Sequence, residues 1–181
     1  DVFANATKST RFMTPPSRGW QLVREAALSL ALNEDFTRDF ANPRQMTPYT
    51  YADSPLTPAL VEDCAFVGGP VSGAACLNAR LPEGGYLLDR TGKGFSALIF
   101  VDHSFSSEEA EIIATLEKLD PHFKGLILPI GDPAYAEVKA VFDAEPGTVY
   151  LLRPDQHVAG RWRHASAQTL ASTLKTCLGR A

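Results

Sequence analysis

Two nearly continuous apolar runs, separated by one amphipathic stretch, constrain the fold of this chain more than any other feature. The runs are residues 94–101 (GFSALIFV) and 125–130 (GLILPI). Such runs are typical of strands that are covered on both faces of a sheet. Between them, residues 107–119 repeat apolar positions at helical spacing. The pattern predicts two parallel strands joined by a right-handed helical crossover.

The remaining elements of the second half extend this sheet. The sequence predicts a helix, two hairpin strands and a last helix at residues 133–142, 148–152, 157–162 and 166–178. Two short edge strands are expected at residues 75–81 and 85–88, around the turn at Pro82. The predicted fold class is α/β, with a thioredoxin-like mixed sheet flanked by helices. Pro146 lies where that fold carries a proline before its hairpin, and its cis or trans state is not readable from the sequence.

The first part of the chain has a different character, because prolines recur through it. Residues 17–31 predict one amphipathic helix with Ser17 as its N-cap. A short helix is expected at residues 34–40, and an extended arm at residues 43–58, where prolines block both helix and sheet. We therefore expect a helical, proline-rich arm at residues 1–64 and a thioredoxin-like domain at residues 65–181. The arm has too little apolar patterning for a core of its own, so it must pack on the second part, a second copy or a domain outside this chain.

Charge and cysteine content exclude several classes of protein. Lys and Arg number 17 and Asp and Glu number 21, for a net charge of −4, which disfavours nucleic acid and anionic membrane as partners. No apolar run approaches the roughly 18 residues of a membrane span. The start at Asp1 has no signal-peptide pattern and no Met, which suggests a fragment. The 3 cysteines are odd in number and lack CxxC spacing, which predicts a cytoplasmic protein without disulfides.

The turn after the first apolar run is where a thioredoxin places its two cysteines, but this chain has serines there. Ser106 and Glu109 have capping-box spacing, so the turn is expected to be structural. Two enzymatic alternatives remain open. A serine hydrolase would use Ser104 or Ser106 with His103, although no nucleophile elbow is present. A single-cysteine peroxidase would use Cys76, although this residue precedes a predicted strand and does not begin a helix.

Other polar residues predict no catalytic, cofactor-binding or metal site. At the hairpin turn, Arg153, Asp155 and His157 predict either an ordinary turn or a surface contact. In residues 161–163, alternation predicts that Trp162 points inward while both arginines stay in water, where a phosphate could bind. Residues 92–94 (GKG) lack the spacing of a phosphate loop, and GxGxxG is absent from the sequence. The four histidines have no zinc-ligand spacing to the cysteines.

Several blocks of the sequence resemble the C-terminal part of FAD-dependent aromatic-ring hydroxylases. The blocks are residues 9–17 (STRFMTPPS), 20–30 (WQLVREAALSL), 42–45 (NPRQ), 51–56 (YADSPL) and 151–159 (LLRPDQHVA). The most similar branches are the 3-(3-hydroxyphenyl)propionate hydroxylase-like and phenol hydroxylase-like flavin monooxygenases. The resemblance implies that residues 65–181 form a thioredoxin-like domain without the active cysteines.

The resemblance also implies a parent enzyme that uses FAD and NAD(P)H to insert one oxygen atom into a phenolic ring. Its flavin-binding residues would precede Asp1, so no cofactor is expected in this segment. Residues 1–64 would be the end of the flavin-side domain and its linker to the thioredoxin-like domain. The segment would serve stability, packing against the upstream flavin and substrate domain of the same polypeptide, or a homodimer contact. The alternative is a stand-alone thioredoxin-like binding or assembly module with no enzymatic role.

Overall fold

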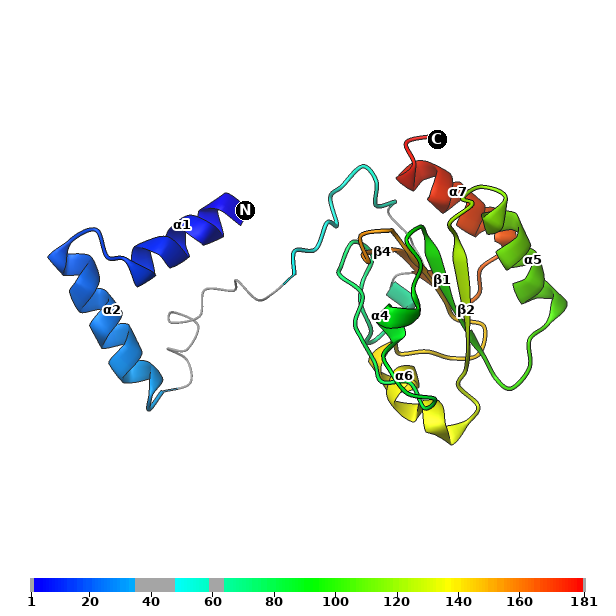
Figure 1. Ribbon diagram of the computed structural model, residues 1–181, viewed down its shortest axis with the longest axis horizontal. Helices are drawn as coiled ribbons and strands as arrows, with labels where there is room; N and C mark the ends of the chain where they lie inside the picture. The colour runs from blue at the N-terminus through cyan, green and yellow to red at the C-terminus, as the bar shows by residue number, and fades with distance from the viewer. Residues whose placement is uncertain (1, 35–47, 59–63, 181) are drawn as a thin grey trace. The chain divides into compact units, whose positions relative to one another are not determined.

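The computed structural model describes residues 2–34, 48–58 and 64–180 of the 181-residue chain (Figure 1). The chain divides into two compact units, Asp1–Pro48 and Tyr49–Ala181. We name them the helical unit and the sheet unit. The domain boundary expected at residues 64 and 65 stays a prediction.

The helical unit contains α1 (Val2–Met13) and α2 (Arg18–Ala31). The sequence predicted α2 and its cap correctly: Ser17 is extended, and its hydroxyl accepts a hydrogen bond from the Trp20 amide at 3.4 Å. The two helices are linked by the Arg24 guanidinium, which donates to the carbonyl of Met13 at 3.3 Å.

Helix α1 was not predicted. Its hydroxyl side chains have low helix propensity, and here they bond back along the helix, as from Thr7 to the carbonyl of Phe3 at 2.8 Å. The short helix expected at residues 34–40 lies outside the described residues, except for Glu34 at its edge. The same holds for residues 43–47 of the expected arm. The described part of that arm, residues 48–58, contains turns and neither helix nor strand.

The sheet unit is built on a four-stranded mixed sheet. The strands are β1 (Ser96–Val101), β2 (Lys124–Pro129), β3 (Val149–Leu152) and β4 (Val158–Trp162), in the order β2-β1-β3-β4. β1 pairs parallel with β2, and β3 pairs antiparallel with both β1 and β4. This confirms the predicted α/β class with a mixed sheet flanked by helices, and the arrangement is consistent with a thioredoxin-like fold.

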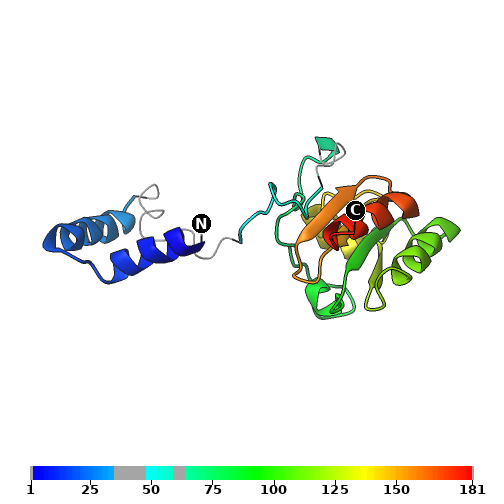
Figure 2. The same cartoon turned by 90° about the horizontal axis from the view of Figure 1, so that it is seen from above.

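Helices cover both faces of this sheet (Figures 1 and 2). On one face lie α5 (Ser107–Glu117) and α7 (Ala167–Cys177), which pack side by side. On the other face lie α4 (Leu87–Arg90) and α6 (Ala136–Val141). All six residues of β1 are buried, as predicted for a strand covered on both faces.

Side chains of the central strands alternate between two core clusters. Leu98 and Phe100 of β1 join Tyr150 of β3 on the α4 and α6 face. Ile99 of β1 joins Trp162 of β4 on the α5 and α7 face. All residues of both clusters belong to the sheet unit.

The prediction of short edge strands at residues 75–81 and 85–88 is wrong. Only single bridges occur there, from Ala75 to His157 and from Arg80 to Tyr86, and α4 replaces the second strand. Two features favour the helix: consecutive glycines with positive φ precede it, and the Asp89 carboxylate accepts from the Tyr86 amide at 3.3 Å. The sequence contains the Asp89 side of this helix start, but the segment was interpreted as a strand that follows the turn at residues 82–85.

The helix expected at residues 133–142 is present in two pieces. A 3₁₀ turn (Pro133–Tyr135) leads into α6. The predicted cap is confirmed, because the Asp132 carboxylate accepts from the Ala134 amide at 2.9 Å. The peptide bond before Pro146 is trans.

Candidate functional site

The turn that would hold a thioredoxin's cysteines is a helix cap. The Ser106 amide donates to the Glu109 carboxylate at 2.7 Å, and the Glu108 amide donates to the Ser106 hydroxyl at 3.2 Å. That hydroxyl also contacts the Glu109 carboxylate directly. Burial raises the pKa of Glu109, but the hydrogen bonds from Ser106 outweigh burial, so the pKa lies below its usual value. The predicted capping box is therefore confirmed.

A serine hydrolase finds no support in this turn. His103 lies 3.8 Å from the Asp102 carboxylate, and the two side chains are 70% and 66% exposed. Within the described residues, no hydrogen bond joins His103 to Ser104 or Ser106. A nucleophilic serine needs a base held against its hydroxyl, and Ser106 instead bonds to a carboxylate that caps the helix.

The peroxidase alternative is not supported by the environment of Cys76. A reactive thiol needs a lowered pKa. Burial raises the pKa of Cys76 to about 12. Burial also raises the pKa of Cys177, although Arg153 opposes it, and the Cys177 thiol donates to the carbonyl of Leu56 at 3.2 Å.

The hairpin turn brings the three predicted contact residues together. The guanidinium of Arg153 lies 2.5 Å from the Asp155 carboxylate, which also accepts from the His157 amide at 3.2 Å. Burial raises the pKa of Asp155, but the His157 amide and Arg153 outweigh it and hold the pKa below its usual value. The Asp155 carboxylate is thus paired within the turn, whereas the Nη1 atom of Arg153 is buried and has no hydrogen-bond partner among the described residues. A contact role for Arg153, Asp155 and His157 stays a prediction.

A segment from the expected arm lies against this hairpin. We name residues 49–58 the tyrosine segment. The rings of Tyr51 and His157 meet edge to face with centroids 5.0 Å apart, and the Tyr51 amide donates to the carbonyl of Gly73 at 2.8 Å. Gly73 has φ +83°, and a Cβ there would lie 2.7 Å from the carbonyl carbon of Tyr51, so only glycine fits. Sequence reasoning missed this contact, although Tyr51 begins one of the resembling blocks.

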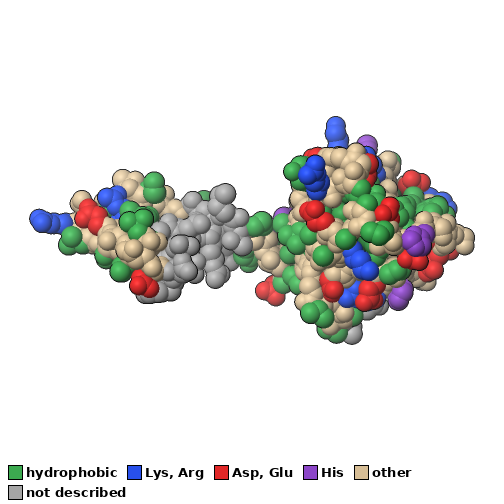
Figure 3. All heavy atoms as spheres, turned by 90° about the horizontal axis from the view of Figure 1, so that it is seen from below, with side chains coloured by type: hydrophobic (Ala, Val, Ile, Leu, Met, Phe, Trp, Pro, Cys, Tyr) green, Lys and Arg blue, Asp and Glu red, His purple; other side chains and the backbone are tan. Residues whose placement is uncertain are grey.

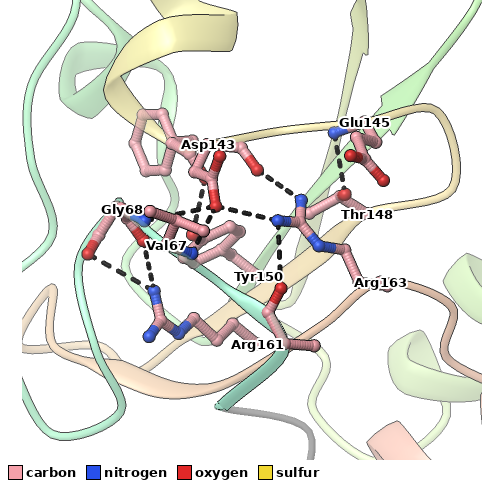
Figure 4. Close-up of polar contacts among 11 residues, drawn as sticks. Val67, Gly68, Asp143, Glu145, Thr148, Tyr150, Arg161 and Arg163 are labelled. Atoms are coloured by element: carbon pink, nitrogen blue, oxygen red, sulfur yellow. Dashed lines mark hydrogen bonds and ion pairs between the residues drawn. The ribbon is translucent and has the colours of Figure 1, made fainter.

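A second polar cluster of the sheet unit holds residues 65–69 (Figure 4). We name Phe66, Asp143, Arg161 and Arg163 the arginine clamp. The two guanidinium carbons lie 4.5 Å (Arg161) and 4.0 Å (Arg163) from the centroid of the Phe66 ring. Arg161 donates to the carbonyl of Gly68 at 2.7 Å, and Arg163 donates to the Asp143 carboxylate at 2.8 Å.

The arginine clamp corrects one expectation and confirms another. Trp162 is 1% exposed, as alternation predicted, but Arg161 is only 3% exposed and does not stay in water. The reason is that residues 66–76 cover the outer edge of β4: the Val158 amide donates to the carbonyl of Ala74 at 2.8 Å. Arg161 and Arg163 direct donors at backbone carbonyls and Asp143, which leaves a phosphate site there without support.

A dinucleotide pyrophosphate binds at a glycine-rich helix start. Helix α5 does not offer one, because serines precede it and the Glu109 carboxylate accepts from the amide of its N-cap, Ser106. The groove along α7, about 390 Å³ in volume, is lined by hydroxyls and other uncharged groups such as Ser166, Thr169 and Thr176.

No group of three or more metal-ligating side chains occurs in the part of the chain that the structure describes. None of the described helices is long and apolar enough to cross a membrane.

Comparison with solved structures finds a similar fold within parts of several flavin-containing enzymes. The rebeccamycin biosynthetic enzyme RebC with reduced flavin matches 98% of this chain and 32% of its own at 21% identity, with a TM-score of 0.60. Aklavinone-11 hydroxylase with FAD and aklavinone matches 77% of this chain and 28% of its own at 25% identity, with a TM-score of 0.54. The flavin-dependent monooxygenase PieE, in complex with FAD and substrate, matches 93% and 31% at 22% identity, with a TM-score of 0.59.

These matches define what the chain is similar to and how much of those proteins it spans. The chain covers about a third of the length of each. At these identities the likeness is one of fold. No protein-family model and no curated protein sequence matches the chain.

Proposed function

We propose that this chain is the C-terminal third of a FAD- and NAD(P)H-dependent aromatic-ring monooxygenase. The observation that carries the proposal is the structural likeness to flavin enzymes, which includes nearly all of this chain and only a third of theirs. The sequence blocks that resemble aromatic-ring hydroxylases support it independently. The flavin and the nicotinamide would bind in the other two thirds, since this sequence has no GxGxxG fingerprint of a dinucleotide site.

The sheet unit itself would be redox-inactive and serve packing. The capped helix start at Ser106 supports this, as do the raised pKa values of Cys76 and Cys177. Thiol chemistry would need the opposite shift. The partners would be the upstream flavin and substrate domain and, in a homodimer, a second copy of the protein.

The hairpin would hold the first segments of the sheet unit against its sheet. The tyrosine segment rests on His157, and the arginine clamp holds residues 65–69 near the same sheet. In this role Arg153 and Asp155 would hold the shape of the turn, and His157 would contact Tyr51 of the tyrosine segment.

The test compares the full-length polypeptide that contains this chain with the 181-residue chain alone. We expect the full-length protein to show bound flavin absorbance and to oxidise NAD(P)H faster when a phenolic compound is added. The 181-residue chain should be colourless and should not consume NAD(P)H. A colourless full-length protein would support the stand-alone binding module instead, and flavin bound to the 181-residue chain would contradict the assignment of the cofactor to the other two thirds.

A further inference from the structure

The outer edge of β4 is covered by residues 66–76, which we name the strap. Two of its hydrogen bonds meet at Val158: the Gly73 amide donates to the carbonyl of Val158 at 2.7 Å, and the Val158 amide donates to the carbonyl of Ala74 at 2.8 Å. The N–H and C=O groups of an uncovered edge strand are the groups that pair with another chain. Both of these groups of Val158 are therefore shielded by the strap.

The strap reaches the core of the sheet unit only at its two ends. Phe66 and Cys76 are each 8% exposed and belong to the core cluster on the α4 and α6 face, and no strap residue between them belongs to either cluster. Hydrophobic side chains lie among charged ones at the surface of the sheet unit, the larger body in Figure 3, and in the strap Val67 is fully exposed and Val71 is 43% exposed. The strap has turns and bends and neither helix nor strand. It therefore buries little apolar surface between its ends.

Polar contacts hold the first end of the strap (Figure 4). The Asp143 carboxylate accepts from the amides of Val67 at 2.9 Å and Gly68 at 3.2 Å. Arg161 of the arginine clamp donates to the carbonyl of Gly68 at 2.7 Å. Water replaces hydrogen bonds of this kind when a segment opens, so each contributes only modestly to the stability of the closed state.

The middle of the strap weakens its hold on the sheet. Ser72 is 7% exposed, and its hydroxyl has no hydrogen-bond partner among the described residues. Burial of an unpaired hydroxyl costs free energy that is recovered when water reaches it. Gly69 and Gly73, on either side, have φ of +72° and +83°. Glycine loses more conformational freedom on folding than any other residue, so opening this stretch regains entropy.

The tyrosine segment lies on the outside of the strap. The Tyr51 amide donates to the carbonyl of Gly73 at 2.8 Å, and the Gly73 amide donates to the carbonyl of Val158. A row of backbone bonds thus runs from the tyrosine segment through the strap to β4. When Gly73 leaves β4, the bonds on both of its sides are broken together.

We propose that the strap opens as one unit while the four-stranded sheet stays folded, and that this opening uncovers the pairing edge of β4. Segments with few buried apolar contacts open with smaller free energies than the global unfolding of the protein. β1, in which every residue is buried, lies at the other extreme. The inference concerns the sheet unit by itself and does not depend on the proposed function.

The first test follows the thiol of Cys76, which the closed strap buries, in the 181-residue chain. Iodoacetamide is added to the folded protein, and peptide mass spectrometry measures how fast each cysteine reacts. Phe66→Ala removes the ring that anchors one end of the strap, and Val67→Ala removes the exposed side chain beside it as a matched control. We expect Cys76 to react at least about tenfold faster in Phe66→Ala and at the wild-type rate in Val67→Ala. The exposed thiol of Cys64 should react equally fast in all three proteins.

The second test is hydrogen exchange of the native chain, which separates strap opening from global unfolding. The amides of Tyr51, Gly73 and Val158 report on the row of bonds through the strap. The Phe100 amide, which donates to the carbonyl of Thr148 at 2.9 Å, reports on the central sheet. After correction for intrinsic rates, we expect the three strap amides to share one opening free energy and to exchange at least about tenfold faster than Phe100.

Three results would overturn the inference. The first is exchange of the strap amides at the rate of Phe100, since the strap would then open only when the whole unit unfolds. The second is an equal rate of Cys76 alkylation in Phe66→Ala and Val67→Ala. The third is a Phe66→Ala protein in which the Phe100 amide is accelerated as much as the strap amides, because the ring would then stabilise the whole sheet unit.

Discussion

The two tryptophans of the chain show how differently its two units are built. Trp162 in β4 is 1% exposed, whereas Trp20 in α2 is 46% exposed. Both occupy positions that the sequence pattern assigns to an apolar face. The sheet unit supplies neighbours for its tryptophan from α5, α7 and the adjoining strands, and the helical unit supplies few.

The comparison teaches that local helix formation and core formation are separate properties. α2 and α7 begin in the same way, with a serine hydroxyl that accepts from the amide three residues on, in Ser17 and Ser166. α7 then buries Leu170 and Leu174 completely, and α2 buries nothing. A cap fixes where a helix begins, and an apolar stripe fixes which of its sides can be buried. Neither feature supplies the second surface against which that side would pack.

The largest expected effect tests this comparison directly. Trp162→Ala should lower the free energy of unfolding of the sheet unit by about 3–5 kcal/mol, because it removes a fully buried ring from a packed cluster. Trp20→Ala in the same 181-residue chain should change it by less than about 0.5 kcal/mol. Urea unfolding followed by far-ultraviolet circular dichroism measures both. Equal losses would show that the helical unit shares the core of the sheet unit.

The next effect concerns the arginine clamp. Arg163→Ala should cost the sheet unit about 1–3 kcal/mol, since the Asp143 carboxylate loses its charged partner and the Phe66 ring keeps only Arg161 of its two guanidinium contacts. The matched control is Arg180→Ala, an exposed arginine near the end of the chain. Cleavage by a protease within residues 64–69 should become faster in Arg163→Ala alone. If both variants unfold and are cleaved like the wild type, the clamp does not hold this segment.

A smaller effect is expected at the helix start that replaces the redox turn. Ser106→Ala should destabilise the sheet unit by about 1 kcal/mol, because the first amides of α5 lose the hydroxyl that accepts from them. Ser104→Ala, two residues earlier and exposed, serves as the control. Thermal unfolding of the two variants side by side gives the difference. A Ser104→Ala loss as large as that of Ser106→Ala would mean that the turn has a role other than capping.

The smallest effect is a dependence on acid. Burial raises the pKa of Asp143, but the amides of Gly68 and Val67 and the guanidinium of Arg163 outweigh it, so the pKa lies below its ordinary value of 3.8. A carboxyl with a lowered pKa stabilises the fold above its ordinary pKa, and that contribution is lost as the pH falls through the lowered value. The stability difference between the wild type and Asp143→Asn should therefore be constant near neutral pH and shrink below pH 3.8. A difference that stays constant through this range would show that the Asp143 charge contributes nothing.

Several features of the candidate site were readable from the sequence because they depend on neighbours a few residues apart. The capping box needs only Ser106 and Glu109, and the hairpin turn needs only residues 153–157. Arg161 was misjudged because its partner, the carbonyl of Gly68, is 93 residues away. The contact of Tyr51 with His157 was missed for the same reason: it joins an irregular segment to a strand end, and no periodic pattern marks it.

By itself the sequence determined the four strands of the sheet, the starts of α2, α5 and α7, and the replacement of a dithiol by a serine cap, since apolar periodicity and capping act over single turns and strands. The tertiary structure decided which stripes become core. It buried the apolar stripe of α7 and left the apolar stripe of α2 exposed. It also covered the edge of β4, so that Arg161 is buried. The physical reason is that burial depends on which distant surface is available to pack, and a residue's own sequence neighbours carry no record of that surface.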